Sequence, residues 1–410
     1  MKKLLILFLG ISLLSCKKSD PNPEMPFDLP QKSAQLIEAD NRFGLDLFKR
    51  IVAESAPNDN VMISPLSVSM ALSMVYNGAN GDTRREMEQT LGFSNLTTEE
   101  VNASHKALLA ALASADPDVL LQVANAIFYH QSLQVKNDFL SVNRNAYNAE
   151  ISSLNFGQAA SLDIINSWVA EKTAGKIPSI LDQLDPDLMM VLLNAVYFNG
   201  IWKSKFDEKR THDLPFTMGD GIQRNVETMQ LESTIAYQSG SLFSAVQLPY
   251  GKGRFAMTLL LPTPGKSMAD VRNELSLTRW NVWMKGFKET SNVVVQMPRF
   301  KFAWELRLNQ TLKAMGMEKP FIPKVADFTG ISSETDLFID FVIHKTYVDV
   351  NENGTEAAAV TAVGMSTTSM PVDQPVKTYF IADRPFVFAI TEKSTGTILF
   401  IGEMNAPSYQ

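Results

Sequence analysis

The side chains that could carry chemistry in this sequence are few and far apart. Ser64, Asn194 and His344 supply a hydroxyl, an amide and an imidazole, from which a nucleophile, an orienting group and a general base could be assembled. None of them stands in a nucleophile elbow, an HExxH zinc motif, a Walker loop or a GxGxxG loop. Ser64 also precedes Pro65, the residue order typical of a helix N-cap, where the hydroxyl is already engaged. The sequence therefore predicts that the protein is not an enzyme.

Metal-binding chemistry has little support either. The chain holds one cysteine, Cys16, and four histidines, at His105, His130, His212 and His344. A single cysteine allows no internal disulfide and no thiolate metal site. We expect no metal site and no cofactor.

Three elements must position Ser64, Asn194 and His344. Ser64 begins a helix through Tyr76 that is apolar nearly all round, and such a helix belongs inside the protein. Asn194 lies in the apolar run 191–198, as expected of a strand buried on both faces. His344 lies in the alternating run FVIHKTYVDVNE, which predicts another strand. Buried polar side chains in such strands need hydrogen-bond partners.

The stretch after this strand, ENGTEAAAVTAVGMSTTSMP at 352–371, is rich in small residues. Read at a period of two, Thr355, Ala357 and Ala359 share one face, and the internal acid Glu356 falls on the other. The composition fits a flexible linker or a strand with one small, buried face. The setting favours the strand, because apolar runs lie both just upstream and just downstream, close to the chain end.

At this point the sequence resembles the serpins, a family of protease inhibitors. NENGTEAAAVTA is similar to the serpin hinge, and ADRPFVFAI with ILFIGEMNAP is similar to the carboxyl-terminal strand pair. ISPLSVSMALSMVYNGANGDTRREM and LLNAVYFNGIWKSKFD match two further family signatures. The matches run in order from about residue 33 to 407. The resemblance implies an α+β fold with helices packed around three β-sheets, and an exposed reactive-centre loop at about 352–375.

The resemblance also implies an activity. The protein would be a suicide-substrate inhibitor of serine proteases, trapping the acyl-enzyme by inserting the cleaved loop into the central sheet. The hinge would comprise Glu352, Gly354, Thr355, Glu356, Ala357, Ala358 and Ala359. Counting along the usual loop length places the reactive bond at Thr368–Ser369, with Met365 and Met370 as alternatives. Elastase-like or subtilisin-like proteases fit these small residues, and papain-like enzymes are not excluded.

Two further clusters are implied by the family pattern. Ser64, Asn194 and His344 match the shutter, a hydrogen-bond cluster beneath the opening point of the main sheet. Arg299, Glu352 and Trp202 match the breach, at the top of that sheet. A solvated surface charge remains the alternative for Arg299 and Glu352, and core packing remains the alternative for Trp202.

A non-inhibitory serpin, acting as a carrier or a plain substrate, is the alternative function. Such relatives tend to have charged, bulky or proline residues at the hinge. None stands on the inward face between Thr355 and Val363, so the inhibitor is favoured.

The amino-acid composition limits the classes of partner that the protein could bind. The 410 residues are 45% hydrophobic and 20% charged, which is ordinary for a globular protein. A net charge of −7 lacks the basic excess of a nucleic-acid binder. Helical patterns dominate the early part of the chain and strand patterns the later part, which predicts an α+β fold. We expect a single domain at 33–410 and a monomer.

The amino-terminal segment predicts a lipoprotein. Lys2 and Lys3 precede a short apolar run and then LLSC, which resembles a bacterial lipobox. Residues 1–15 would be the signal peptide, Cys16 the lipidated residue, and 16–32 a disordered tether. The alternative is an ordinary secretory leader with an accidental cysteine. The lipobox predicts a location in a bacterial cell envelope, with the outer membrane or the cell surface as the expected site.

Overall fold

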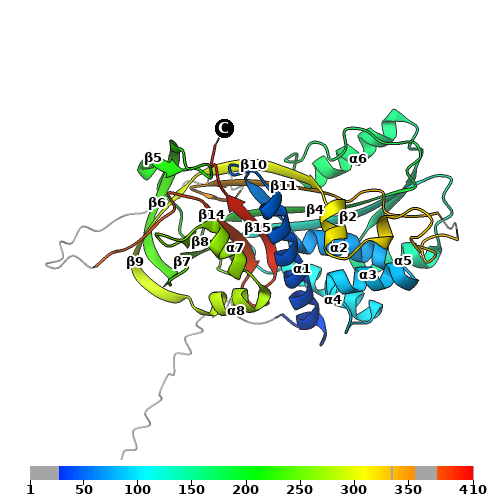
Figure 1. The fold of residues 1–410 in the computed structure, drawn as a ribbon, viewed down its shortest axis with the longest axis horizontal. Coiled ribbons are helices and arrows are strands. Elements are labelled where there is room, and N and C mark those ends of the chain that lie inside the picture. Colours follow the sequence, from blue (N-terminus) through cyan, green and yellow to red (C-terminus); the bar gives the residue numbers. More distant parts are fainter. Residues whose placement is uncertain (1–26, 334–335, 356–375, 410) are drawn as a thin grey trace, which may run out of the picture.

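The computed structural model describes residues 27–333, 336–355 and 376–409 (Figure 1). The expected signal peptide, Cys16 and most of the tether lie outside the described residues. So do Glu356 and the hinge alanines, and the reactive-bond candidates Met365, Thr368, Ser369 and Met370.

Nine α-helices lie in the described residues, most of them before residue 190. They are α1 (Ser33–Glu54), α2 (Pro65–Tyr76), α3 (Gly81–Leu91), α4 (Thr98–Ala113), α5 (Asn137–Tyr147), α6 (Ala159–Lys172), α7 (Met268–Glu274), α8 (Leu277–Lys285) and α9 (Asn309–Ala314). The helix starts agree with the sequence: Ser64 caps α2 ahead of Pro65, and Thr97 caps α4 in a capping box with Glu100.

The strands form two hydrogen-bonded networks. One is a six-stranded sheet in the order β10 (Phe300–Arg307), β11 (Ile343–Asn351), β12 (Gly354–Thr355), β4 (Met190–Ile201), β2 (Val119–His130) and β3 (Glu150–Leu154). β12 pairs antiparallel with both of its neighbours, so Thr355 stands opposite Val350 on one side and Gly200 on the other.

The second network joins nine strands. Its order is β1 (Val61–Ile63), β15 (Ile398–Met404), β14 (Phe386–Glu392), β8 (Phe255–Pro262), β7 (Phe243–Pro249), β6 (Gln223–Ser239), β9 (Lys288–Pro298) and β13 (Thr378–Ile381), with β5 (His212–Thr217) on β6. The register shifts between Ser233 and Ile235 of β6. Before this point β6 pairs with β5 and β9, and after it β6 also joins β7. The network thus divides into a smaller and a larger sheet, three sheets in all, as expected.

The buried helix α2 lies between two sheets. It contacts β4 on one side and β15 on the other, which explains why its sequence is apolar nearly all round. Helix α6 packs on the opposite face of the six-stranded sheet, where Ile165 and Trp168 join Phe128 in a separate apolar cluster. The helices α2 to α5 and the strands β5, β6 and β9 lie toward opposite ends of the molecule (Figure 1).

One expectation for β4 was wrong. Its apolar run predicted burial on both faces, but its residues alternate between buried and half-buried positions. The buried row, Val191, Leu193 and Ala195, packs in the apolar cluster under α6. The half-buried row, which includes Leu192, Asn194 and Val196, faces α2, so it is the row on that side that keeps some contact with solvent.

Candidate functional site

The segment that leads into the expected loop is held inside the six-stranded sheet. The expected exposure of the loop at 352–375 is wrong at its start: Thr355, its last described residue before 376, is 3% exposed and lies between β11 and β4. Its hydroxyl oxygen is 2.6 Å from the phenol oxygen of Tyr250. Burial raises the pKa of Tyr250, so the phenol stays protonated and can donate to Thr355. The inward orientation that the period of two predicted for Thr355 is therefore observed.

Gly354 is required at its position by close approach of two backbones. A Cβ atom there would lie 2.0 Å from the carbonyl oxygen of Gly200 and 2.8 Å from the Cα atom of Ile201. Because these are main-chain atoms, they could not move aside without disturbing β4. Only glycine lets β12 enter the sheet at this point.

Arg299 and Glu352 meet just before this strand. The Nε atom of Arg299 is 3.5 Å from Oε2 of Glu352, which is 5% exposed, and Thr211 donates a 2.5 Å hydrogen bond to Oε1. The guanidinium also approaches Glu227 at 3.3 Å, and it lies 3.8 Å from the ring centre of Tyr409. The alternative of two independent surface charges is therefore wrong for this pair.

Trp202 lies beside the same segment. Its indole Nε1 donates to the carbonyl oxygen of Asn351 at 2.8 Å, and its backbone amide donates to the carbonyl oxygen of Asn353 at 2.9 Å. Its ring stacks on Tyr250, with centroids 4.3 Å apart and an angle of 15° between the planes. Trp202 thus has a packing role and a hydrogen-bonding role, and both act on the turn between β11 and β12.

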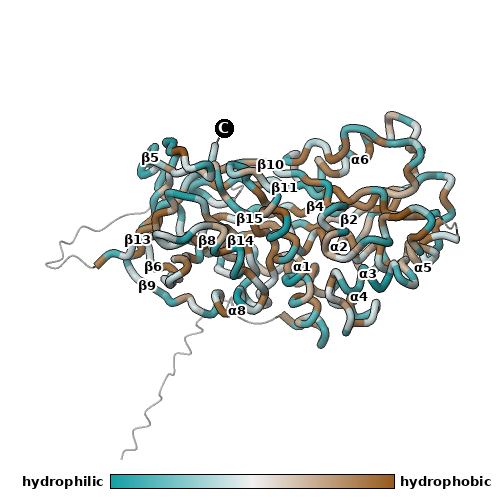
Figure 2. Tube along the Cα trace, viewed as in Figure 1, coloured by the Kyte–Doolittle hydropathy of each residue, from teal (hydrophilic) through white to brown (hydrophobic). Residues whose placement is uncertain are grey.

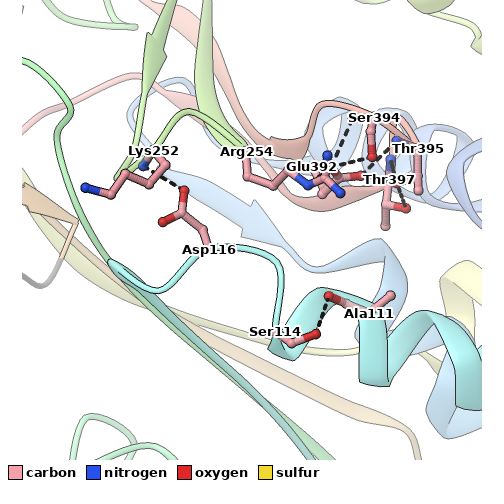
Figure 3. Close-up of polar contacts among 9 residues, drawn as sticks. All are labelled: Ala111, Ser114, Asp116, Lys252, Arg254, Glu392, Ser394, Thr395 and Thr397. Atoms are coloured by element: carbon pink, nitrogen blue, oxygen red, sulfur yellow. Dashed lines mark hydrogen bonds and ion pairs between the residues drawn. The ribbon is translucent and has the colours of Figure 1, made fainter. Parts of the chain in front are cut away.

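The turn that carries Tyr250 is itself fixed from two sides (Figure 3). Asp116 accepts a hydrogen bond from the Lys252 amide at 2.8 Å. Arg254 lies 3.5 Å from the fully buried carboxylate of Glu392, which also accepts hydrogen bonds from Ser394 and Thr395. These contacts hold the β7–β8 turn against the segment before β2 and the end of β14, and the Gly251 amide donates to the carbonyl oxygen of Ile201 at the end of β4 at 2.9 Å. Together they set the position of the Tyr250 ring.

Ser64 and His344 form a direct contact, but not the expected three-residue cluster. The backbone amide of Ser64 donates to Nε2 of His344 at 2.9 Å, while the Ser64 hydroxyl accepts from the Ser67 amide at 3.3 Å. Burial lowers the pKa of His344 to about 3, so the ring is neutral and can accept this bond.

Asn194 is reached through a different serine. The hydroxyl of Ser67 donates to Oδ1 of Asn194, whose amide donates to Asn125 at 2.6 Å, and Asn125 donates to the carbonyl of Tyr147 at 2.7 Å. His344 and Asn194 therefore bond to residues three positions apart at the start of α2, Ser64 and Ser67, and not to each other. The Ser64 hydroxyl is buried within a helix cap, which leaves it no access to a substrate.

Sequence reasoning missed several residues of this site. Tyr250, Gly200, Thr211 and Tyr409 contact the segment 351–355 although they are distant in the chain. Tyr250 stands at the start of a recognisable Tyr-Gly-Lys-Gly turn, yet nothing local ties that turn to Thr355. The remaining contacts arise from sheet pairing and from the carboxyl terminus folding back, which leave no signal in sequence spacing.

Metal and membrane features were searched in the described residues. In that part of the chain, no group of three or more His, Cys, Asp or Glu side chains could hold a metal ion. Likewise, none of the helices at 27–333, 336–355 and 376–409 has the length and apolar character to cross a bilayer.

Known proteins with similar sequences and structures share this architecture. A sequence model described as "Serpin (serine protease inhibitor)" matches residues 38–407. Human leukocyte elastase inhibitor is 34% identical over 385 residues, covering 91% of this chain and 100% of that protein. The crystal structure of tengpin, a thermophilic serpin, in its native state superposes with a TM-score of 0.83 at 31% identity, covering 94% of this chain and 97% of tengpin. Thyroxine-binding globulin in complex with thyroxine gives a TM-score of 0.82 at 27% identity, covering 92% of this chain and 100% of that one.

Three findings agree: the fold has helices around three sheets, the segment 351–355 is held inside the six-stranded sheet, and the family model matches nearly the whole chain. This protein belongs to the serpin family.

Proposed function

We propose that the protein is a suicide-substrate inhibitor of serine proteases, acting through insertion of its own loop. The observation that carries this proposal is the position of β12. Its two residues already pair with β11 and β4 at once, so the beginning of the loop is aligned with the strand position that the loop would fill. The loop would not have to find its register in the sheet, because each further residue would extend an antiparallel pairing that β12 has already begun.

The protease would begin by its normal chemistry. Its nucleophile attacks a carbonyl in the loop, the peptide bond breaks, and an acyl-enzyme forms. The reactive bond that we propose is Thr368–Ser369, with Met365 and Met370 as alternatives. The cut would free the loop from its carboxyl-terminal attachment, so the segment from Thr355 onward could follow β12 into the sheet and carry the acylated protease with it.

The hinge chemistry suits this step. Glu352 would remain paired with Arg299 just before β12 while the loop inserts, whereas Gly354 and Thr355 present only small groups to the interior of the sheet. Ala357 and Ala359 would continue that row, and small uncharged groups enter a closing sheet with little desolvation penalty. About a dozen new backbone hydrogen bonds at 0.5–1.5 kcal/mol each would contribute on the order of 10 kcal/mol. The intact form would then be a kinetically trapped state.

We propose a gating role for the contacts of α2. His344 is on β11 and Asn194 is on β4, the two strands between which the loop would enter, and both bond to the start of α2. Parting of the strands would have to strain or exchange these bonds, so the pair would set how readily the sheet opens.

Elastase-like and subtilisin-like proteases are the proposed targets, with papain-like enzymes as further candidates. Support comes from the similarity to leukocyte elastase inhibitor and from the small residues near Thr368. The decisive experiment mixes the intact protein with leukocyte elastase, subtilisin or papain and analyses the products by denaturing electrophoresis and intact mass. We expect an SDS-stable adduct of one protease with one cleaved chain, and the mass of the released peptide gives the reactive bond.

A carrier function is the second candidate, because thyroxine-binding globulin shares the fold at 27% identity. A carrier or plain substrate would be cut cleanly by all three proteases, without any adduct. Turnover of a small ester or peptide by the protein alone would instead indicate an enzyme.

We further propose that Cys16 is lipidated and holds the protein in a bacterial cell envelope. Support comes from the LLSC sequence after a short apolar leader. A Cys16→Ala variant should move from the membrane fraction to the soluble fraction after cell lysis. Recovery of the parent protein in the soluble fraction, with an unmodified Cys16, contradicts the anchor.

A further inference from the structure

The segment that follows β15, residues 405–409, returns to the start of the loop. The side chain of Asn60 accepts hydrogen bonds from the first two backbone amides of this segment, both at 2.9 Å. Further along, the carbonyl oxygen of Ser408 accepts a hydrogen bond from the Lys301 amide of β10 at 2.9 Å. Figure 2 shows this segment passing β10 on its way to the end marked C. These bonds fix the backbone on both sides of the point from which Tyr409 extends.

Tyr409 contacts the turn between β11 and β12 in two ways. Its ring centre lies 3.8 Å from the guanidinium carbon of Arg299, the partner of Glu352. Its hydroxyl oxygen accepts a hydrogen bond from the side-chain amide of Asn351 at 3.4 Å. A cation is attracted to an aromatic face within about 6 Å, so the ring contact is a close one. The hydrogen bond, in contrast, is long for an N–H donor. We therefore expect the ring to contribute more than the hydroxyl.

The carboxylate partners of Arg299 hold its guanidinium only loosely. The Nε atom is 3.5 Å from Oε2 of Glu352, and this buried Nε makes no well-formed hydrogen bond in the described residues. The second carboxylate, Glu227, is 45% exposed, and water screens exposed ion pairs. The Tyr409 ring covers the guanidinium and limits its rotation, because it lies in direct contact with it. The position of the charge beside Glu352 therefore depends on this ring.

We propose that Tyr409 is a positioning residue for loop insertion, which holds Arg299 against Glu352 and so keeps β12 paired with β11 and β4. The inference rests on the proposed inhibitory function and adds to it a residue that controls the start of insertion. Thr355 follows Glu352 by only three residues, so loss of this support would let β12 leave the sheet part of the time. A loop whose first strand residues are unpaired would insert later after cleavage, and release of active protease would compete with trapping.

Hydrogen exchange tests the positioning role without any protease. The backbone amides of Trp202 and Phe206 donate to carbonyl oxygens within the segment 351–355, at 2.9 and 3.0 Å. Their exchange rates therefore report how often this segment leaves its place. In Tyr409→Ala we expect both amides to exchange about three- to tenfold faster than in the parent. Tyr409→Phe keeps the ring over Arg299 and should exchange at close to the parent's rate.

The second measurement is the number of inhibitor molecules consumed for each molecule of leukocyte elastase trapped. We expect this number to rise about threefold in Tyr409→Ala. The loop should be cut at the same bond and at the parent's rate, because residue 409 is not part of the loop. Arg299→Ala should raise the number as well, and adding Tyr409→Ala to it should change little, since Tyr409 acts through Arg299.

Ser408→Ala is the matched control. The Ser408 side chain is exposed and adjacent to Tyr409, and the substitution keeps the carbonyl oxygen that bonds to Lys301. Both the exchange rates and the number of inhibitor molecules consumed should therefore equal those of the parent.

The outcomes separate the proposal from the inhibitory function. Exchange rates in Tyr409→Ala equal to the parent's overturn the positioning role, and so does an equal loss in Tyr409→Phe and Tyr409→Ala, which would assign the effect to the hydroxyl. Faster exchange with unchanged consumption of inhibitor overturns the link to insertion. If the parent forms no adduct with elastase, subtilisin or papain, the inhibitory function fails, whereas faster exchange in Tyr409→Ala still supports Tyr409 as the residue that holds the segment 351–355.

Discussion

In the proposed mechanism, insertion of the loop depends on Thr355. It is buried between two strands and bonded to Tyr250, so any side chain at this position must fit the interior of the sheet. An arginine there would lose its hydration without gaining a charged partner, which costs several kcal/mol. Thr355→Arg should therefore keep β12 out of the sheet and delay insertion, while attack on the loop continues.

The expected result for Thr355→Arg is a change from inhibitor to substrate. Gel analysis should show the variant cut at the same bond as the parent, at a similar rate, with active protease released and little adduct. Thr355→Ser retains the hydroxyl and should behave like the parent. If Thr355→Arg still traps protease with the parent's efficiency, then insertion does not begin at this residue.

His344 gives the stability a defined pH dependence. Burial lowers its pKa to about 3, whereas a histidine in the unfolded chain titrates near 6.5. Between these two values the unfolded chain binds a proton that the folded chain does not. Stability is therefore complete above about pH 6.5 and falls as the pH drops toward 3, by up to about 1.4 kcal/mol per pH unit from this group.

The measurement is the thermal midpoint at closely spaced pH values from 7.5 to 5. The parent should lose stability below about pH 6.5, and His344→Ala, although less stable throughout, should show a shallower slope in this window. Parallel curves for the two proteins would mean that His344 is not the responsible group.

At the scale of elements, β12 exists because a glycine precedes Thr355. The Cβ of an alanine at position 354 would collide with the backbone of β4, and forcing extra atoms into a packed site costs roughly 1–3 kcal/mol. Gly354→Ala should displace β12 and raise the fraction of chains that are cleaved without trapping protease. Gly240→Ala, where the nearest atom would be an ordinary 3.6 Å away, is the control and should match the parent in gel assays.

Filling the position next to β12 should change the stability of the entire sheet. A proteolytic cut near Thr368 would let the loop extend β12 along the facing sides of β11 and β4, adding strand hydrogen bonds that the intact form lacks in the proposed mechanism. Differential scanning calorimetry should then show a sharply higher thermal midpoint for the cut protein. A cut protein that melts at or below the temperature of the intact one would exclude insertion.

For the whole molecule, the proposed mechanism makes lifetime the relevant measure of stability, because a trapped state persists through its barrier. His344→Ala should lower that barrier. It leaves the buried Ser64 amide without its acceptor, a loss of about 1–3 kcal/mol, and weakens the link between β11 and α2. During incubation at 37 °C the variant should lose inhibitory activity faster than the parent, and native gels should show larger species or an inactive monomer. Equal half-lives would leave His344 with a packing role alone.

Local sequence patterns predict several features of the fold. The N-caps at Ser64 and Thr97, the apolar helix α2 and the alternation in β11 follow from hydrogen-bonding capacity and side-chain periodicity within a few neighbouring residues. Four ordered motifs likewise indicated the family, and the inward position of Thr355 followed from a period of two. These features could be predicted because each depends on residues adjacent in the chain.

The contacts that hold the segment 351–355 depend on tertiary structure instead. Tyr250 reaches Thr355 across 105 positions, and Ser64 reaches His344 across 280. The sequence suggested that Ser64, Asn194 and His344 meet, but not that Ser67 would be the partner of Asn194. Ser64 is the N-cap of α2 and Ser67 lies in its first turn, so either serine could face β4. Which one does is decided by the rotation of α2 between two sheets, and that rotation results from packing of its entire apolar surface.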